Sequence, residues 1–114
     1  MINKWDIYYC DLDPRVGSEQ KGVRPVLVIS TDAVNHNLPV SSVLPFSSTK
    51  PGDKIYPTEV ALEASITGLP MDSIVMIQQI RTVSHSRLTN LAGTLHDALA
   101  QKKVLAACRD YFDL

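Results

Sequence analysis

Basic side chains gather in the second half of this sequence. Residues 73–96 contain Arg81 and Arg87 together with two histidines, but no aspartate or glutamate. Acidic residues are frequent elsewhere, and the formal net charge of the chain is −1. A chain that is nearly neutral overall can therefore present one locally basic face, which is what the binding of phosphate groups requires. Because so short a segment also lacks acids by chance, its charge alone does not define a site.

Arg24 has a sequence context that gives its side chain a fixed direction. It stands directly before Pro25, and a residue before proline is restricted to extended backbone geometry. Residues 25–30 form an apolar run rich in β-branched side chains, so Arg24 is predicted at the start of a buried strand. Its planar guanidinium suits a phosphoryl group, because it donates two parallel hydrogen bonds. The alternative is an exposed arginine that pairs with Glu19.

The histidines and cysteines do not indicate a metal site. His36, His85 and His96 form no HxxxH or HxH arrangement with carboxylates, so neither a metal nor a cofactor is predicted. Cys10 and Cys108 lie far apart and in no CxxC arrangement. Both are predicted to be reduced structural thiols.

The first two thirds of the chain have the pattern of short strands separated by turns. Strands are predicted, from β-branched and aromatic content, at residues 7–10, 25–30, 40–46 and 74–77, with weaker alternation at 58–62 and an extended continuation at 78–83. Loops are predicted at residues 15–22, 32–39 and 47–56, and a break at 68–70. Pro25 fits only the start of its strand, because proline cannot donate to a sheet ladder.

The end of the chain has helical periodicity. One side of the predicted helix carries Leu95, Ala98, Leu99, Leu105, Ala106 and Phe112. Thr94 and Asp97 are placed as an N-cap pair. Lys102 falls within the apolar stripe, so its stem snorkels, or the helix is incompletely covered, or a partner meets it there. Short strands with a closing helix predict a mainly β fold with α structure (α+β), a highly curved antiparallel sheet or small barrel.

Length and composition are those of one globular domain. The chain has 114 residues, of which 45% are hydrophobic and 20% charged, so a single domain over residues 1–114 is expected. No apolar run approaches the roughly 18 residues that span a bilayer, and the first residues have no secretory pattern. A cytoplasmic protein without membrane contact is expected.

Four sequence blocks occur in a specific order. They are DLDP at residues 11–14, GSEQKGVRPVLVI at 17–29, VLPFSS at 43–48 and DSIVMIQQIRT at 72–82. Together they cover most of the chain and closely resemble the signature of the MazF/PemK-like toxin family. The resemblance implies an SH3-like curved barrel, a homodimer, and metal-free cleavage of single-stranded RNA at short sequence motifs. It also implies inhibition by a cognate antitoxin with an acidic, disordered tail.

Metal-free cleavage of RNA uses the ribose 2′-OH as nucleophile, so a site must remove that proton, stabilise a phosphorane and protonate the departing 5′-oxygen. The resemblance implies that Arg24 stabilises the phosphorane. It also implies that Ser47 occupies the family's second catalytic position, a Thr or Ser at the end of the third strand. Ser48 is the alternative hydroxyl, because neighbours on a strand face opposite sides; both serines could instead begin a polar loop. RNA contacts are implied for Glu19, Gln20, Lys21, Ser48, Gln79, Arg81 and His85.

The chain departs from the family pattern at two positions. Many members carry an acidic residue where this chain has Ser84, which puts a carboxylate base at that position in doubt. His85 could move a proton instead, although an exposed loop histidine is the simpler interpretation. Many members also have Gly where this chain has Trp5, a change expected to alter local packing rather than chemistry.

Two other functions remain open at this stage. Relatives of the same architecture poison DNA gyrase, but they end in Trp-Gly-Ile, whereas this chain ends in Tyr-Phe-Asp-Leu. The second alternative is a catalytically degenerate toxin that acts as a binding module, which the missing carboxylate at Ser84 favours. Arg24 and Ser47 favour the nuclease.

Overall fold

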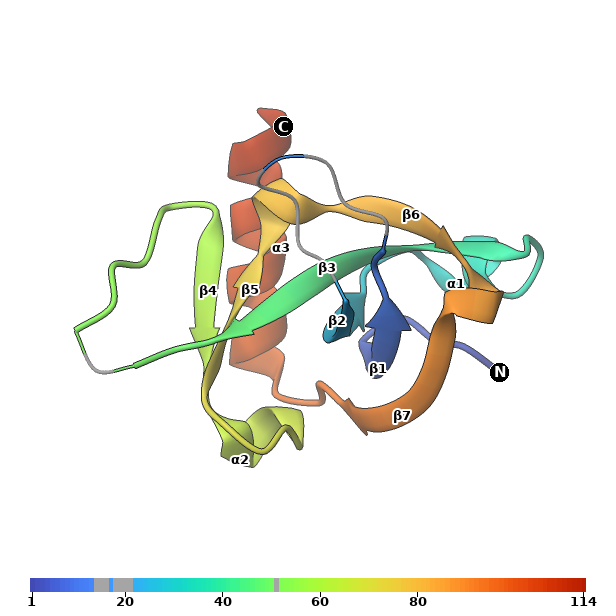
Figure 1. The fold of residues 1–114 in the computed structure, drawn as a ribbon. Coiled ribbons are helices and arrows are strands. Elements are labelled where there is room, and N and C mark those ends of the chain that lie inside the picture. Colours follow the sequence, from blue (N-terminus) through green and yellow to red (C-terminus); the bar gives the residue numbers. More distant parts are fainter. Residues whose placement is uncertain (14–16, 18–21, 51) are drawn as a thin grey trace.

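Antiparallel strands dominate the computed structural model, which describes residues 1–13, 17, 22–50 and 52–114 (Figure 1). The strands are β1 (Asp6–Asp11), β2 (Val23–Val28), β3 (Val40–Ser48), β4 (Glu59–Leu62), β5 (Ser73–Met76), β6 (Arg81–Ser84) and β7 (Leu88–Thr94). The helices are α1 (Asp32–Asn35), α2 (Ala64–Thr67), α3 (Ala98–Phe112) and the 3-10 turns η1 (Ile77–Gln79) and η2 (His85–Arg87). None of the helices in these ranges is long and apolar enough to cross a membrane.

The long strand β3 organises the sheet. Its first part pairs with β6 and its last part with β5, while β2 pairs along its middle. The sheet has the order β4-β5-β3-β2-β1-β7, with β6 beside β3. The predicted extended run at 78–83 is therefore interrupted, because η1 carries the chain from one end of β3 to the other. The sheet curves strongly as a result (Figure 1).

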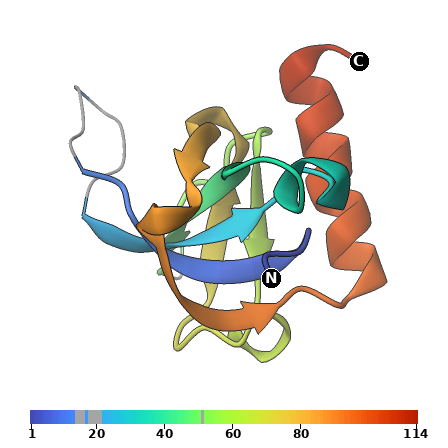
Figure 2. The same cartoon turned by 90° about the vertical axis from the view of Figure 1, so that its right-hand side faces the viewer.

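Each face of the curved sheet has its own hydrophobic cluster. The larger cluster includes Ile7, Leu27, Phe46 and Val104, so it lies between the sheet and α3. The smaller cluster consists of Cys10, Leu12, Val26, Val28, Val43 and Val83 on the opposite face. Figure 2 shows β7, β1 and β2 side by side, with α3 standing beside the ends of these strands. The predicted class, mainly β with a C-terminal helix, is confirmed.

Helix α3 begins later than predicted. Its N-cap is Asp97, whose side chain accepts a hydrogen bond of 2.8 Å from the backbone N–H of Ala100. The predicted role of Thr94 in the cap is wrong, because Thr94 ends β7 and its hydroxyl donates to Asp6 Oδ1 at 3.0 Å. Strand β7 was not predicted at all, since its sequence LTNLAGT has little of the alternation that marks a strand.

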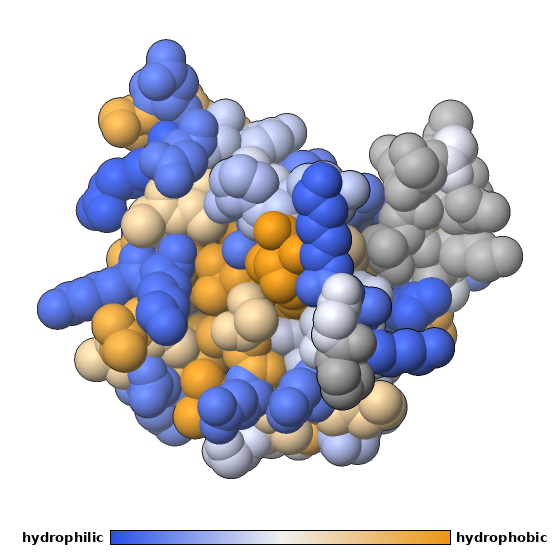
Figure 3. All heavy atoms as spheres, turned by 90° about the vertical axis from the view of Figure 1, so that its left-hand side faces the viewer, coloured by the Kyte–Doolittle hydropathy of each residue, from blue (hydrophilic) through white to orange (hydrophobic). Residues whose placement is uncertain are grey.

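The buried side of α3 also differs from the prediction. It consists of Ala100, Val104 and Ala107, whereas Leu99 is 62% exposed. The predicted stripe was counted from Leu95, which is buried but lies before the helix. Lys102 is exposed and lies outside the buried side, so its stem needs no special accommodation. Figure 3 shows apolar side chains gathered in the middle of one face of the molecule, within a hydrophilic surround.

Strand bounds near Arg24 and the two serines shift by a few residues. Ser47 and Ser48 belong to β3 and not to the predicted loop. Pro25 is the third residue of β2 rather than its first. It is tolerated because the pairing of β2 with β3 starts only at Val26, so Pro25 pairs with β1 alone. Residues 32–39, predicted as a loop, contain the short helix α1.

Trp5 adopts a backbone conformation that suits glycine. Its φ is 76°, in the left-handed region that bulky residues rarely adopt. Two backbone hydrogen bonds fix this geometry, from its N–H to Val28 O at 2.8 Å and from the Leu95 N–H to its carbonyl at 2.9 Å. The ring packs against the larger cluster. The departure from the family pattern at Trp5 therefore affects the backbone as well as local packing.

Trp5→Gly is expected to be more stable than Trp5→Ala by about 1 kcal/mol, although both lose the ring. The left-handed conformation costs an L-residue about 1–2 kcal/mol and costs glycine almost nothing. Urea midpoints of the two variants measure the difference. The matched pair is Lys4→Gly and Lys4→Ala, since Lys4 has no positive φ and alanine should there be equal or better. The same order at both positions would contradict the assignment of strain to Trp5.

Candidate active site

Arg24 and Ser47 project from the same face of neighbouring strands. Val26 of β2 lies opposite Pro45 of β3 in the antiparallel ladder. Arg24 stands two residues before Val26 and Ser47 two residues after Pro45, so alternation places both side chains on one side of the sheet. Arg24 is exposed and Ser47 half-buried. A guanidinium and a hydroxyl are thus presented together at the open ends of β2 and β3.

Ser48 projects from the opposite face. It is exposed and shares its side of β3 with Phe46, which is 1% exposed. Both line a cavity of about 220 Å³, which Tyr9 and Arg24 also line. Of the two hydroxyls that the sequence left open, Ser47 is therefore the one on the face of Arg24.

Two further arginines lie on the face that carries Arg24 and Ser47, which we call the arginine face. Arg81 lies opposite Val43, which shares that face with Ser47. Cys10 lies directly opposite Arg24 in the ladder, and its thiol interacts electrostatically with the guanidinium groups of Arg81 and Arg87. Burial raises the pKa of the Cys10 thiol, and the guanidinium charges of Arg81 and Arg87 oppose this rise. Arg24, Arg81 and Arg87 thus gather around this part of the sheet, and the Asp11 carboxylate beside them adds an opposing negative charge.

Arg81 and Arg87 hold the backbone at the end of β1. Nη1 of Arg81 donates to Leu12 O at 3.0 Å. Nη1 of Arg87 donates to Asp11 O at 3.1 Å and to Asp13 O at 2.6 Å. Both guanidinium groups therefore anchor the chain just before residues 14–21. The anchoring role of Arg87 was not predicted, because its partners are backbone carbonyls and no pattern of residue types reveals them.

The other end of this connection is held as well. Gly22 donates its N–H to Asp13 Oδ1 at 2.9 Å, and its carbonyl accepts from Leu12 N at 2.9 Å. Three of the predicted RNA contacts, Glu19, Gln20 and Lys21, lie outside the described residues. Their neighbours on both sides are anchored next to the arginine face.

Gln79 is half-buried and ends η1, two residues before β6 begins at Arg81. It therefore precedes Arg81 on the approach to the arginine face.

The histidines give no sign of a metal group: across residues 1–13, 17, 22–50 and 52–114, no three His, Cys, Asp or Glu side chains cluster in a way that would hold an ion.

His85 lies far from Arg24 and Ser47. Its backbone N–H donates to Pro39 O at 2.9 Å, at the start of β3, and its Nε2 lies 2.8 Å from the hydroxyl of buried Ser41. About seven strand residues separate this position from Ser47, roughly 20 Å at the usual strand rise. His85 is half-buried and hydrogen-bonded, so it is not the exposed loop histidine that the sequence suggested. Its position at the start of β3 also keeps it from transferring a proton beside Arg24.

Ser84, the position of the missing carboxylate, shares this remote location. It pairs with Val40 at the start of β3, and its hydroxyl lies 3.0 Å from that of Ser86. Ser84 is therefore about as far from Ser47, measured along β3, as His85 is. The absence of a carboxylate there does not change the groups around Arg24, which removes the main support for a degenerate site.

The Cys10 thiol is expected to resist alkylation in the folded protein. Cys10 is fully buried, and burial raises its thiol pKa, so little reactive thiolate is present near pH 8. Because the folded pKa is the raised one, this contribution to stability is complete below the unfolded pKa and is lost as pH rises through the folded pKa. Iodoacetamide labelling with peptide mass spectrometry should modify Cys10 only after denaturant is added. Rapid labelling of Cys10 without denaturant would contradict its burial.

A basic sheet face with a strand-start arginine and a strand-end hydroxyl is the kind of site that binds a phosphodiester group. The family model for the PemK-like, MazF-like toxin of type II toxin-antitoxin system matches residues 3–111. The chain belongs to this family, as the sequence blocks predicted.

Two curated relatives carry names that describe an activity. Endoribonuclease EndoA of Bacillus subtilis (strain 168) is 39% identical over 102 residues, which cover 90% of this chain and 87% of the relative. Endoribonuclease MazF of Staphylococcus saprophyticus is 38% identical over 97 residues, which cover 85% and 80%. The prediction of an endoribonuclease agrees with both names.

Solved structures share the fold. MazF from Deinococcus radiodurans (form I) has a TM-score of 0.82 at 24% identity, covering 99% of this chain and 97% of that chain. A mycobacterial endoribonuclease in complex with its cognate antitoxin has a TM-score of 0.81 at 22% identity, covering 100% and 97%. The curved sheet with a C-terminal helix is therefore the MazF fold.

Proposed function

We propose that this protein is an endoribonuclease toxin that cleaves single-stranded RNA without a metal ion. The observation that carries the proposal is the common face of Arg24 and Ser47 at the open ends of β2 and β3. The names of the two curated relatives support the reaction class. The guanidinium groups of Arg24 and Arg81 on one face of the sheet support an anionic substrate.

In the proposed reaction the ribose 2′-oxygen attacks the phosphorus and loses its proton, and the bond from phosphorus to the 5′-oxygen breaks. The 5′-oxygen takes up a proton, so the products carry a 2′,3′-cyclic phosphate and a 5′-OH. Arg24 donates hydrogen bonds to the phosphoryl oxygens, and these bonds strengthen as negative charge develops. The Ser47 hydroxyl donates to the same phosphate group and fixes its orientation.

The remaining RNA contacts are proposed around this pair. Arg81 lies on the arginine face, Gln79 ends η1 two residues before it, and Ser48 lines the cavity beneath the ends of β2 and β3. Glu19, Gln20 and Lys21 belong to the connection whose two ends are anchored beside Arg24, and the family resemblance supports a contact with RNA there. His85 lies at the other end of β3, so a contact there would be with RNA remote from the scissile phosphate.

Two protein partners are part of the proposal. A cognate antitoxin with an acidic, disordered tail would complement the arginine face, and the mycobacterial relative was solved with its antitoxin. A homodimer would cover apolar side chains near the C-terminus, where Tyr111 is 42%, Phe112 50% and Leu114 89% exposed. Both partners are expected in the cytoplasm.

The test is incubation of the purified protein with a mixed-sequence single-stranded RNA in excess chelator. Fragments with cyclic phosphate and 5′-OH ends are the expected products. RNA that stays intact would refute the nuclease, and cleavage that requires added divalent metal would refute the metal-free mechanism. A toxin that instead inhibits gyrase and leaves RNA intact would assign the alternative target.

A further inference from the structure

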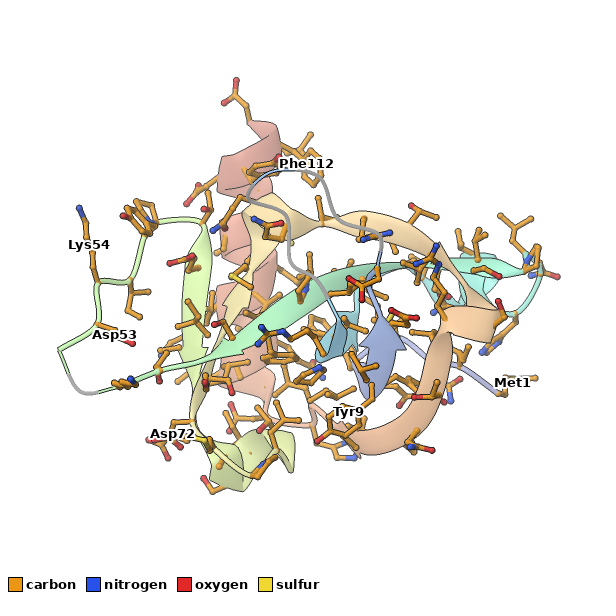
Figure 4. All side chains as sticks on the ribbon, in the orientation of Figure 1. Met1, Tyr9, Asp53, Lys54, Asp72 and Phe112 are labelled. Atoms are coloured by element: carbon orange, nitrogen blue, oxygen red, sulfur yellow. The ribbon has the colours of Figure 1, made fainter. Side chains whose placement is uncertain are left out.

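The cavity that Arg24 and Ser48 line lies on the sheet face opposite Ser47 and takes no part in the bond-breaking step described above. It is bounded by Tyr9 of β1, Pro25 of β2, Phe46 of β3 and Met71 of the α2–β5 connection, and its volume is about 220 Å³. We call it the Tyr9 cavity. Figure 4 shows Tyr9 on the side of the sheet where α2 and the chain around Asp72 lie.

We propose that the Tyr9 cavity binds the base of a nucleotide next to the scissile phosphate and so sets part of the cleavage motif. This inference rests on the proposed nuclease function. Arg24 lines the cavity, and Pro25 is the next residue along the chain, so the cavity and the phosphate clamp are neighbours. A nucleotide whose phosphate contacts Arg24 has its base within reach of the cavity.

The walls of the Tyr9 cavity are held in place before any ligand binds. Asp72 accepts a hydrogen bond of 2.8 Å from Ala64 N, and its carbonyl accepts from Thr49 N at 3.1 Å, which ties α2 and the end of β3 to the start of β5. Ser73 is 5% exposed, and its hydroxyl donates to Met71 O at 3.1 Å. The cavity is therefore preformed, which lowers the entropic cost of binding.

The lining has the chemistry that an unpaired base requires. Tyr9 and Phe46 are aromatic, Met71 is a polarizable side chain, and Ser48 adds a hydroxyl. Stacking of a base on such side chains contributes about 1–3 kcal/mol. The volume lies below the range of about 300–1,000 Å³ that accommodates drug-sized ligands, so it suits a single heterocycle.

The rim of the cavity is unusually apolar for a surface beside a charged site. Met71 is 55% exposed, and Val23, next to Arg24, is 64% exposed. Apolar side chains grouped at the edge of a cavity offer a surface that a bound ligand can cover. A base that reaches the cavity around the Arg24 end of β2 would cover both.

The experiment compares wild-type protein with Met71→Ala and Tyr9→Leu, which removes the aromatic ring, on a randomised single-stranded RNA pool, with cleavage positions read by sequencing. We expect the base preference at one motif position to change about 5-fold or more, while preferences at other positions stay. Leu91→Ala is the matched control, because Leu91 is 57% exposed and lies on β7, outside the cavity.

A second measurement uses binding alone. An oligonucleotide with the preferred motif and a 2′-deoxy sugar at the cleavage position is made with an abasic nucleotide at each site in turn. Wild-type protein should lose about 5-fold or more in affinity at one abasic position, and Met71→Ala should lose little further there.

The inference is overturned if wild-type protein cleaves the pool and the cavity variants keep its base preferences. It is also overturned if these variants keep the preferences but bind an acidic antitoxin peptide more weakly, since the cavity then serves the protein partner. Absence of cleavage by wild-type protein is a different result, because it refutes the proposed function itself.

Discussion

Arg24→Ala is expected to lower kcat for RNA cleavage roughly 100- to 1000-fold. The magnitude is that of losing one fixed donor to a transition-state anion. Arg24 is exposed and stands at the start of β2, so its removal leaves the buried clusters of the sheet intact. Single-turnover cleavage of a labelled RNA measures the loss, with thermal unfolding run in parallel.

Arg24→Lys separates charge from geometry at this position. Lysine keeps the positive charge but lacks the planar fork that bonds two phosphoryl oxygens, so it should recover only part of the lost rate. Arg109→Ala is the matched control, because Arg109 is an exposed arginine in the last turn of α3. Equal rates for Arg24→Ala and Arg109→Ala would rule out Arg24 as the clamp.

The parts of the fold that the sequence predicted are those with strong local signals. The β-branched run after Pro25 gave β2, and Gly68 ends α2 with a φ of 79°, where the break was predicted. Strand β7 was missed because it pairs with β1, more than seventy residues away, and its own sequence has little alternation. A strand that depends on a distant partner has no short-range signature.

The site was predicted in part for the same reason. The motif GSEQKGVRP predicted that Arg24 is a functional residue. The motif could not show whether Ser47 or Ser48 lies on the same face of the sheet as Arg24. That answer needed the ladder between Val26 and Pro45, a contact between two strands. The remote positions of Ser84 and His85 also follow from pairing, since β6 meets the start of β3 and not its end.

The left-handed backbone at Trp5 was visible only as a departure from the family pattern. The sequence located an unusual residue, and the structure supplies its cause, a φ of 76°. The presence of tryptophan at this position does not by itself predict a positive φ. The family glycine was the useful signal, because glycine at a fixed position often marks a positive φ.

Ser47→Ala is expected to lower cleavage about 10- to 100-fold. The hydroxyl lost is a donor to a charged phosphate, an interaction of about 1.5–3 kcal/mol. Ser47 is half-buried near the end of β3, where it lies opposite Ile74 of β5. Because the sheet ladder is made by backbone groups, replacing the serine side chain with alanine leaves the pairing of β3 with β5 unchanged. The same single-turnover assay measures the effect.

Ser47→Thr tests whether the hydroxyl is what matters at this position. Threonine keeps an O–H donor and favours a strand, so Ser47→Thr should cleave within a few-fold of wild type. Ser86→Ala is the control for loss of a serine hydroxyl, because Ser86 is exposed on η2 at the remote end of β3. If Ser47→Ala cleaved as fast as Ser86→Ala, Arg24 would act without a hydroxyl partner from β3. If Ser47→Thr were as slow as Ser47→Ala, the loss would come from packing rather than from the missing donor.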